Sequence, residues 1–189
     1  KCLFFSDVHK VENGVFCDEK GDIYSADNGN NTFIMNKKDI RIPGEHNVQN
    51  YMAAISAVMG FVTAENVVKV AKTFGGVEHR IEFVRELDGV KWYNDSIATS
   101  PTRAIAGLNS FDKKLIIIAG GYDKHIPFDP FAKKAITNIK LLILTGATAD
   151  AIESCVRKQD GFEQSGLEIV RVKDIKEAVD VARKRAKAG

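Results

Sequence analysis

The chain has 189 residues, of which 44% are hydrophobic and 28% charged, and its formal net charge is +2. This length allows one large domain, or one domain and part of another. The small net charge does not favour a nucleic acid or a membrane surface as a partner. No apolar run approaches the roughly 18 residues that a membrane span needs. The sequence does not begin with methionine, so we interpret it as part of a longer protein.

The cysteines exclude two classes of small protein. Cys2, Cys17 and Cys155 are odd in number and show no CxxC spacing. This pattern argues against a disulfide framework or a zinc site and favours a reducing compartment.

The first part of the chain reads as short strands and turns. The run "VFCDEKGDIYSA" places two β-like segments around Lys20-Gly21, which predicts a hairpin. The turn cluster "DNGNN" at 27–31 follows, and then the short runs "TFIM" and "DIRIP". We therefore expect residues 1–43 to be strands and turns.

The hydrophobic period changes at residue 46. Apolar residues now recur at helical spacing, which predicts a helix over 46–61 and a second over 64–73. Gly75 and Gly76 follow the second helix as a C-cap and flexible joint. We place a domain boundary there, which gives domains 1–76 and 77–189.

The second domain alternates strands and helices. "RIEFVREL" and "VKWYND" flank Asp88-Gly89, a strong hairpin signal. The apolar run "LIIIAGG" at 115–121 is typical of a buried parallel strand. Strands at 140–146 and 168–172 and helices at 101–109, 129–138, 147–158 and 174–187 complete the reading. The predicted fold class is α/β, a Rossmann-like domain with a mainly parallel sheet flanked by helices.

The last predicted helix has an apolar face and a basic end. The apolar positions are Ile175, Ala178, Val179, Ala182 and Ala186. We interpret the basic residues of 183–187 as cations at a helix C-terminus and a solvated face, in preference to a nucleic-acid patch.

Two segments follow predicted strands where an α/β sheet binds its ligands. They are "NDSIATSP" after "VKWY" and "GGYDKH" after "LIIIA". Each also has an ordinary structural reading, because Asn94, Asp95 and Ser96 suit turns and caps, and Lys124 suits a solvated loop. Neither a Walker A loop nor GxGxxG occurs in the sequence, so its own motifs show no complete catalytic apparatus.

Three segments together resemble the Mur ligases, the ATP-dependent amino-acid ligases of peptidoglycan assembly. They are "GEHNVQNYMAAISAV" at 44–58, "GVEHRIEFV" at 76–84 and "YNDSIATSP" at 93–101. Asn-Asp-Ser-x-Ala-Thr is similar to the pattern of those members that add D-glutamate to UDP-N-acetylmuramoyl-L-alanine. The resemblance covers 44–189 well and 1–43 loosely.

This resemblance implies a domain assignment and a reaction. Residues 1–76 would be the β-hairpin and helical tail of a central ATPase domain, and 77–189 most of the C-terminal amino-acid-binding domain. ATP and Mg²⁺ would be the cofactors, with the magnesium ligands upstream, and an acyl phosphate the intermediate. We expect a cytoplasmic, monomeric full-length enzyme with small-molecule substrates, no nucleic acid and no membrane insertion. Residues 1–189 alone should be inactive.

The resemblance also assigns nucleotide-binding roles. Asn47 and Asn50 would lie at the nucleotide base, because a carboxamide offers a donor beside an acceptor. Helix capping is the alternative for Asn47. His79 and Arg80 would lie at the phosphates, where the planar fork of an arginine fits. Asp95 would accept hydrogen bonds from the ribose hydroxyls.

For the amino acid, the resemblance implies that Thr99 and Lys124 hold the carboxylates of D-glutamate, Lys124 as a point charge. No residue of the chain is assigned to a metal or to a catalytic step. Ile97 departs from the family, which commonly has lysine after Asn-Asp-Ser, so no role passes to it.

Two other interpretations remain open at this point. One is a different Mur-type amino-acid ligase, although the Asn94-Asp95-Ser96 motif disfavours it. The other is a nucleotide-binding or assembly module that uses the fold without chemistry.

Overall fold

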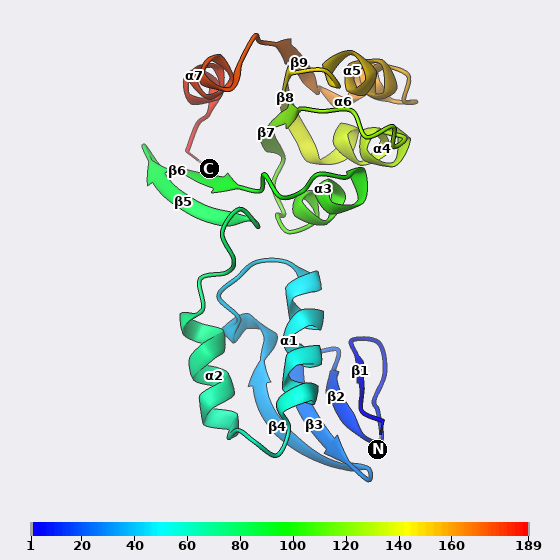
Figure 1. Cartoon of the computed structure of the whole chain (residues 1–189), viewed down its shortest axis with the longest axis vertical. Helices are drawn as coiled ribbons and strands as arrows, with labels where there is room; N and C mark the ends of the chain where they lie inside the picture. The colour runs from blue at the N-terminus through cyan, green and yellow to red at the C-terminus, as the bar shows by residue number, and fades with distance from the viewer. Residues whose placement is uncertain (1, 189) are drawn as a thin grey trace. The chain divides into compact units, whose positions relative to one another are not determined.

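The computed structural model describes residues 2–188. The chain divides into two compact units, Lys1–Gly76 and Val77–Gly189, and each is described here by itself. Figure 1 shows the elements of both units. No helix within residues 2–188 is long and apolar enough to cross a membrane.

The first unit contains a four-stranded sheet in the order of the sequence. Its strands are β1 (Phe4–Ser6), β2 (Gly14–Cys17), β3 (Asp22–Asp27) and β4 (Asn30–Asn36). β2 and β3 form the predicted hairpin, in which Asp18 Oδ1 accepts the N–H groups of Lys20 and Asp22, both at 2.9 Å. β1 pairs in parallel with β2, which the sequence reading did not predict.

The segment directly after β4 is a helical turn, which the sequence reading did not predict. Lys37–Asp39 form the 3₁₀ helix η1. Asn36 Oδ1 accepts the N–H of Lys38 at 3.0 Å, and the Asp39 carboxylate accepts the N–H of Asn36 at 3.3 Å. This reciprocal cap stabilises a helical turn. Residues 40–43 of the run "DIRIP", which follow this turn, form no strand.

Two helices pack against this sheet (Figure 1): α1 (Glu45–Val58) and α2 (Ala64–Thr73). α2 has the predicted bounds, and the Thr63 side chain caps it by accepting the N–H of Asn66 at 3.3 Å. α1 ends three residues before the predicted position, because its C-cap Met59 leaves helical geometry with a ψ of 130°. The core between sheet and helices includes Val15, Ile23, Met35, Val48, Met52 and Ile55.

The second unit begins with a separate hairpin, β5 (Glu82–Leu87) and β6 (Val90–Asn94). Asp88 and Gly89 have φ values of 53° and 74°, as a type I′ turn requires. The hairpin is therefore confirmed. It is a two-stranded sheet of its own, so the expectation that the segment after β6 lies at an edge of the parallel sheet is wrong.

The parallel sheet has three strands in the order β7-β8-β9. They are β7 (Leu115–Gly120), β8 (Ile139–Thr145) and β9 (Glu168–Arg171). The helices are α3 (Pro101–Leu108), α4 (Asp129–Asn138), α5 (Ala149–Arg157), α6 (Phe162–Ser165) and α7 (Ile175–Arg185). The short α6 was not predicted.

Strand β8 is the centre of this unit, because alternate side chains enter two cores. Leu142 and Leu144 belong to the core formed with α3, α4 and α5. Leu141 and Ile143 belong to the core formed with α7. Figure 1 shows α4 and α5 on one side of the sheet and α7 on the other. The prediction of an α/β domain with a parallel sheet between helices is confirmed.

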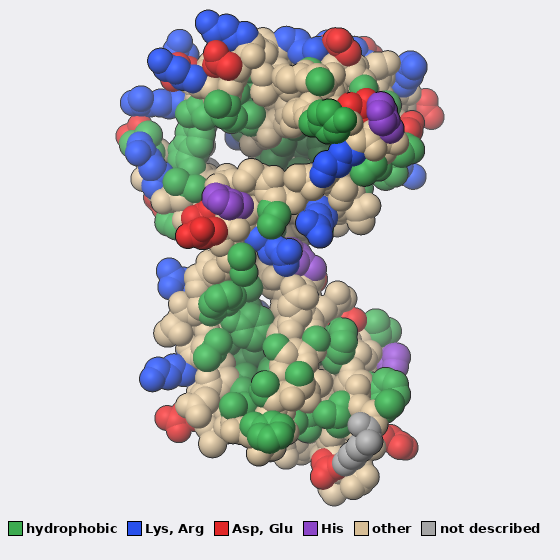
Figure 2. Space-filling model, in the orientation of Figure 1, with side chains coloured by type: hydrophobic (Ala, Val, Ile, Leu, Met, Phe, Trp, Pro, Cys, Tyr) green, Lys and Arg blue, Asp and Glu red, His purple; other side chains and the backbone are tan. Residues whose placement is uncertain are grey.

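Helix α7 buries less of its predicted apolar face than expected. Ala178 and Ala182 are buried, whereas Ile175 is 62% exposed and Val179 is 40% exposed. The last turn carries Arg183, Lys184 and Arg185, and Lys and Arg side chains gather over α7 in Figure 2.

An ion-pair network joins α5 to β9. Glu153 accepts hydrogen bonds from Arg171 Nε at 2.6 Å and from Arg157 Nε at 2.7 Å, and Arg171 also pairs with Asp150. Hydrogen bonds from Arg171 and then Arg157 lower the pKa of Glu153 below its ordinary value of 4.5. The network therefore stabilises the fold only while Glu153 is ionised.

This gives a prediction for acid unfolding. Since the folded pKa of Glu153 is depressed, its stabilisation is complete above its unfolded pKa and is lost as pH falls through the folded value. Glu153→Gln keeps the shape but cannot titrate. The unfolding midpoint of the wild type, followed by the single tryptophan Trp92, should fall more steeply below about pH 4.5 than that of the variant. If the unfolding midpoints of the wild type and the variant fell in parallel as the pH is lowered, the role of Glu153 would be contradicted.

Candidate functional site

In the first unit, the two asparagines of α1 differ in what they can still bind. Asn47 is 6% exposed; its Nδ2 donates to the carbonyl of Pro43 at 2.6 Å, and its Oδ1 accepts from Asn50 Nδ2 at 3.4 Å. Gly44 is the N-cap of α1, so Asn47 does not occupy that position. Asn50 is exposed, and its carboxamide oxygen bonds no other described residue. Of the two, Asn50 therefore has the side chain that a base can reach.

The second unit has an unusual turn at its start. His79 and Ile81 have φ values of 64° and 45°, in the left-handed region. A β-branched residue such as isoleucine is a genuine outlier there. Such backbone strain costs of order 1–3 kcal/mol and persists only where surrounding contacts enforce it. Arg80 lies between these two residues.

Hydrogen bonds from the segment after β6 hold this turn. Asp95 Oδ1 accepts the N–H of Ile81 at 3.1 Å. The N–H of Ile97 donates to the carbonyl oxygen of His79 at 3.2 Å. The predicted site residues His79, Arg80 and Asp95 are thus brought together, although Asp95 is 15 positions beyond Arg80 in sequence.

Glu82 and Asn94, cross-strand partners in the hairpin, complete the arrangement. Glu82 Oε2 accepts the N–H of His79 at 2.9 Å. Asn94 Oδ1 accepts the N–H of Ser96 at 3.1 Å, which turns Asn94 Nδ2 toward His79 Nδ1 at 2.9 Å and Glu82 Oε2 at 3.4 Å. Because an amide NH₂ only donates, this places an acceptor at His79 Nδ1 and the ring proton on Nε2.

These hydrogen bonds fix the backbone on either side of Arg80, whose side chain stays exposed. Arg80 is exposed, and its guanidinium forms no hydrogen bond or ion pair with any other residue in the described range 2–188. A planar fork of five donors held in this way is suited to phosphate oxygens.

Asp95 also touches helix α3. A Cβ built on Gly107 would lie 2.8 Å from Asp95 Oδ2. A glycine at this position therefore lets the helix approach the carboxylate. The Asp95 carboxylate in this way contacts both the turn at 79–81 and the last turn of α3.

Thr99 lies on the exposed segment that leads into α3. Ser100 is the N-cap and Pro101 the first helical residue, although the Ser100 hydroxyl makes no capping hydrogen bond. Arg103, from the first turn of α3, donates from Nη1 to the carbonyl of Ile97 at 3.5 Å. This places a second exposed cation beside the Asn-Asp-Ser motif.

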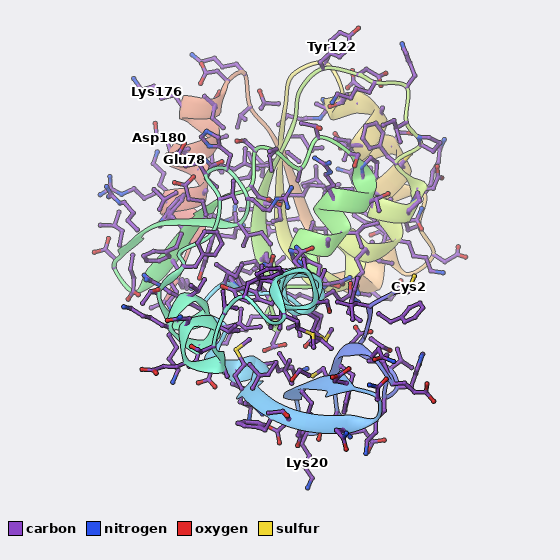
Figure 3. The ribbon with its side chains drawn as sticks, turned by 60° about the horizontal axis from the view of Figure 1, so that its bottom comes forward. Cys2, Lys20, Glu78, Tyr122, Lys176 and Asp180 are labelled. Carbon is purple, nitrogen blue, oxygen red and sulfur yellow. The ribbon has the colours of Figure 1, made fainter. Side chains whose placement is uncertain are left out.

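Lys124 belongs to the irregular segment between β7 and α4. Gly120, with φ of 138°, ends β7 so close to β8 that an added Cβ would lie 1.7 Å from the carbonyl oxygen of Thr145. Beyond it the loop is exposed, and the side chain of Tyr122 points away from the fold (Figure 3). Lys124 is exposed and pairs with no other described residue. It lies beyond the carboxyl end of a parallel strand, as predicted.

No group of three or more His, Cys, Asp or Glu side chains within residues 2–188 is arranged to hold a metal ion. The residues that the sequence analysis assigned to a nucleotide offer a carboxamide, an arginine and a carboxylate.

Comparison with known families decides the identity. Residues 79–189, more than half of the chain, match the family described as Mur ligase, glutamate ligase domain. The chain belongs to the Mur ligase family.

Curated relatives of this Mur ligase chain extend the match to both units. The chain is 50% identical over 188 residues to the UDP-N-acetylmuramoylalanine–D-glutamate ligase of Clostridium acetobutylicum. It is 45% identical over 188 residues to the ligase of the same name from Clostridium botulinum. Each alignment covers 99% of this chain and 40% of the relative, so the chain spans about two fifths of their length.

Solved structures of related ligases share the fold. A murein peptide ligase from Psychrobacter arcticus has a TM-score of 0.59 and 17% identity over 99% of this chain and 42% of its own. A pseudomurein peptide ligase type C from Methanothermus fervidus has a TM-score of 0.62 and 14% identity over 95% and 38%.

Sequence reasoning gave no site role to three residues of this candidate site. Asn94 was interpreted as a turn residue and as part of the Asn-Asp-Ser motif, and Glu82 and Gly107 received no role. A lone glycine inside a helical pattern is a usable signal, since it often has a packing reason. The contacts of Glu82 join residues on two strands and carry no local signature.

Gly107 gives a direct test of the contact with Asp95. In most exposed helices Gly→Ala stabilises by about 1 kcal/mol. Here Gly107→Ala should destabilise by about 1 kcal/mol or more, because the Asp95 carboxylate is displaced from the N–H of Ile81. The same change in an Asp95→Ala background should be neutral or stabilising. Urea unfolding followed by Trp92 fluorescence measures both, and an equal effect in both backgrounds would refute the contact.

Proposed function

We propose that the chain is part of an ATP-dependent ligase that adds D-glutamate to UDP-N-acetylmuramoyl-L-alanine in peptidoglycan precursor synthesis. The observation that carries this proposal is 45–50% identity over 99% of the chain to relatives named for that reaction. The Asn94-Asp95-Ser96 motif and the glutamate ligase domain match support the same substrate.

The reaction has two steps. The carboxylate of the alanyl group attacks the γ-phosphorus of ATP, which forms an acyl phosphate and releases ADP. The amine of D-glutamate then attacks the acyl carbon, loses a proton, and the tetrahedral intermediate expels inorganic phosphate. Positioning and charge stabilisation supply most of the rate in such transfers.

The second unit supplies residues suited to the polyphosphate. Arg80 has its whole guanidinium available for phosphate oxygens. The Nε2–H of His79 is on the ring edge opposite Asn94, and it can donate to an oxygen as well. Because its motif resembles that of the family, Asp95 would accept hydrogen bonds from the ribose hydroxyls. Its Oδ1 would still accept the N–H of Ile81.

The remaining assignments are proposals about each unit by itself. Asn50 would pair with the adenine base, since its carboxamide presents a donor and an acceptor. Residues 1–76 would be the end of the ATPase domain, with the Walker A loop and the Mg²⁺ ligands elsewhere in the full-length protein. Thr99 and Lys124 would bind the carboxylates of D-glutamate, which leaves its amine free to attack.

The first functional prediction compares the full-length protein with residues 1–189. With UDP-N-acetylmuramoyl-L-alanine, D-glutamate, ATP and magnesium, the full-length protein should release ADP only when D-glutamate is present. Residues 1–189 should release none, because they contain no phosphate-binding loop. Full-length activity with L-alanine or diaminopimelate in place of D-glutamate would identify a different Mur-type ligase. Turnover by residues 1–189 would contradict the domain assignment.

The second functional prediction concerns Lys124. In the full-length protein, Lys124→Ala should raise KM for D-glutamate about 10- to 150-fold, since a hydrogen bond to a charged group is lost. The KM for ATP should change by less than about twofold. Lys124→Arg should rescue poorly, because a planar fork does not replace a point charge.

Lys113→Ala is the matched control, since Lys113 is also exposed and has no partner among the described residues. It should leave both constants unchanged. Equal shifts in both constants, or none, for Lys124→Ala would show that Lys124 is an ordinary solvated lysine.

A further inference from the structure

We propose that Glu82 is a positioning residue: with Asn94 it holds the strained turn at His79–Ile81 so that Arg80 is presented to the nucleotide phosphates. The inference rests on the proposed function for the role of Arg80. The geometry of the turn is independent of that role.

The turn that carries Arg80 is strained. His79 and Ile81 both have left-handed φ values, and Arg80 lies between them. If the turn relaxed to ordinary φ values, the direction of the Arg80 Cα–Cβ bond would change. The contacts that enforce the turn therefore determine where the guanidinium lies.

Different residues hold the two ends of the turn. Asp95 holds the C-terminal end through the N–H of Ile81. Glu82 holds the N-terminal end through the N–H of His79 at 2.9 Å, and the N–H of Ile97 donates to the His79 carbonyl. Without Glu82, the His79 N–H loses its acceptor while the opposite end stays fixed.

The Glu82 side chain is itself held in one orientation. Its side chain is about one third exposed, and its Oε2 lies 3.4 Å from Asn94 Nδ2 and 3.7 Å from His79 Nδ1. Asn94 cannot rotate its amide without losing the N–H of Ser96. Charge-assisted bonds of this kind are the stronger ones in proteins. One carboxylate oxygen thus joins the Asn94 side chain on β6 to the backbone of the turn.

The first measurement is hydrogen–deuterium exchange of residues 78–82 in the full-length protein. Glu82→Ala should raise exchange in this segment, because the N–H of His79 loses its acceptor. Glu86→Ala is the matched control: Glu86 is exposed on the same strand, and its side chain forms no hydrogen bond or ion pair with a described residue, so its variant should exchange as the wild type does. Unchanged exchange in Glu82→Ala would overturn the proposal, whatever reaction the protein catalyses.

The second measurement is steady-state kinetics. Glu82→Ala should lower kcat/KM for ATP about tenfold, since misplacing a binding group by about 1 Å costs up to about 100-fold. Asn94→Asp keeps an acceptor for Ser96 but turns a carboxylate toward Glu82, so it should show a similar loss. Glu82→Gln retains an oxygen for the His79 N–H and should recover most of the activity.

A double-mutant cycle separates positioning from a general loss of structure. In an Arg80→Ala background, Glu82→Ala should cause no further loss in kcat/KM for ATP beyond about twofold. Additive losses, or equal losses in the constants for ATP and D-glutamate, would overturn the proposal. Failure of the proposed function is recognised separately, because the wild type itself would then show no ADP release dependent on D-glutamate.

Discussion

The hydrogen bond from the N–H of Ile81 to the Asp95 carboxylate joins the parts of the candidate site. It joins two residues that lie 14 positions apart on either side of the β5–β6 hairpin, so the start and the end of that hairpin are held together. The same carboxylate lies against Gly107 of α3. The direction of Arg80, the path into α3 and the contact with that helix all depend on this one side chain. The Asp95 carboxylate therefore has a structural role in the absence of any ligand.

The parallel sheet provides the second constraint. Strand β8 places alternate side chains into two cores, one with α3, α4 and α5 and one with α7. The helices on both faces of the sheet therefore pack against the same strand. At its carboxyl end, β8 comes so close to Gly120 that no side chain fits there. The loop that carries Lys124 begins at this contact. Its start is fixed by the packing of two strands, while its exposed part is free to meet a ligand.

Local patterns predicted most of the elements. The hairpin at Asp88–Gly89, the buried strand "LIIIAG" and helix α2 follow from turn chemistry, apolar runs and helical periodicity, which are properties of neighbouring residues. The separate two-stranded sheet was not predictable in this way, because strand partners are chosen by contacts distant in sequence. The 3₁₀ turn after Asn36 was missed because its capping box joins Asn36 to Asp39 within a stretch too short to show helical periodicity.

The residue types of the candidate site were predictable, but the hydrogen bonds that connect them were not. Arg80, Asp95 and Lys124 follow from the resemblance to the family, and their roles stay predictions. The left-handed turn at His79 and Ile81 has no sequence signature, since neither is a glycine. The orientation of Asn94 and the use of Glu82 depend on hydrogen bonds between strands. Asn47 shows the opposite case, because burial and a bond to the Pro43 carbonyl occupy a side chain that looked available.

The most direct measurement is a crystal structure of the full-length protein with a non-hydrolysable ATP analogue. The account predicts that the Arg80 guanidinium bonds phosphate oxygens and that the Asp95 carboxylate accepts from a ribose hydroxyl. It also predicts that the bonds from Asp95 to Ile81 and from Glu82 to His79 remain as they are here. Phosphates bound away from Arg80, or a turn at 79–81 that relaxes when the nucleotide binds, would contradict the account.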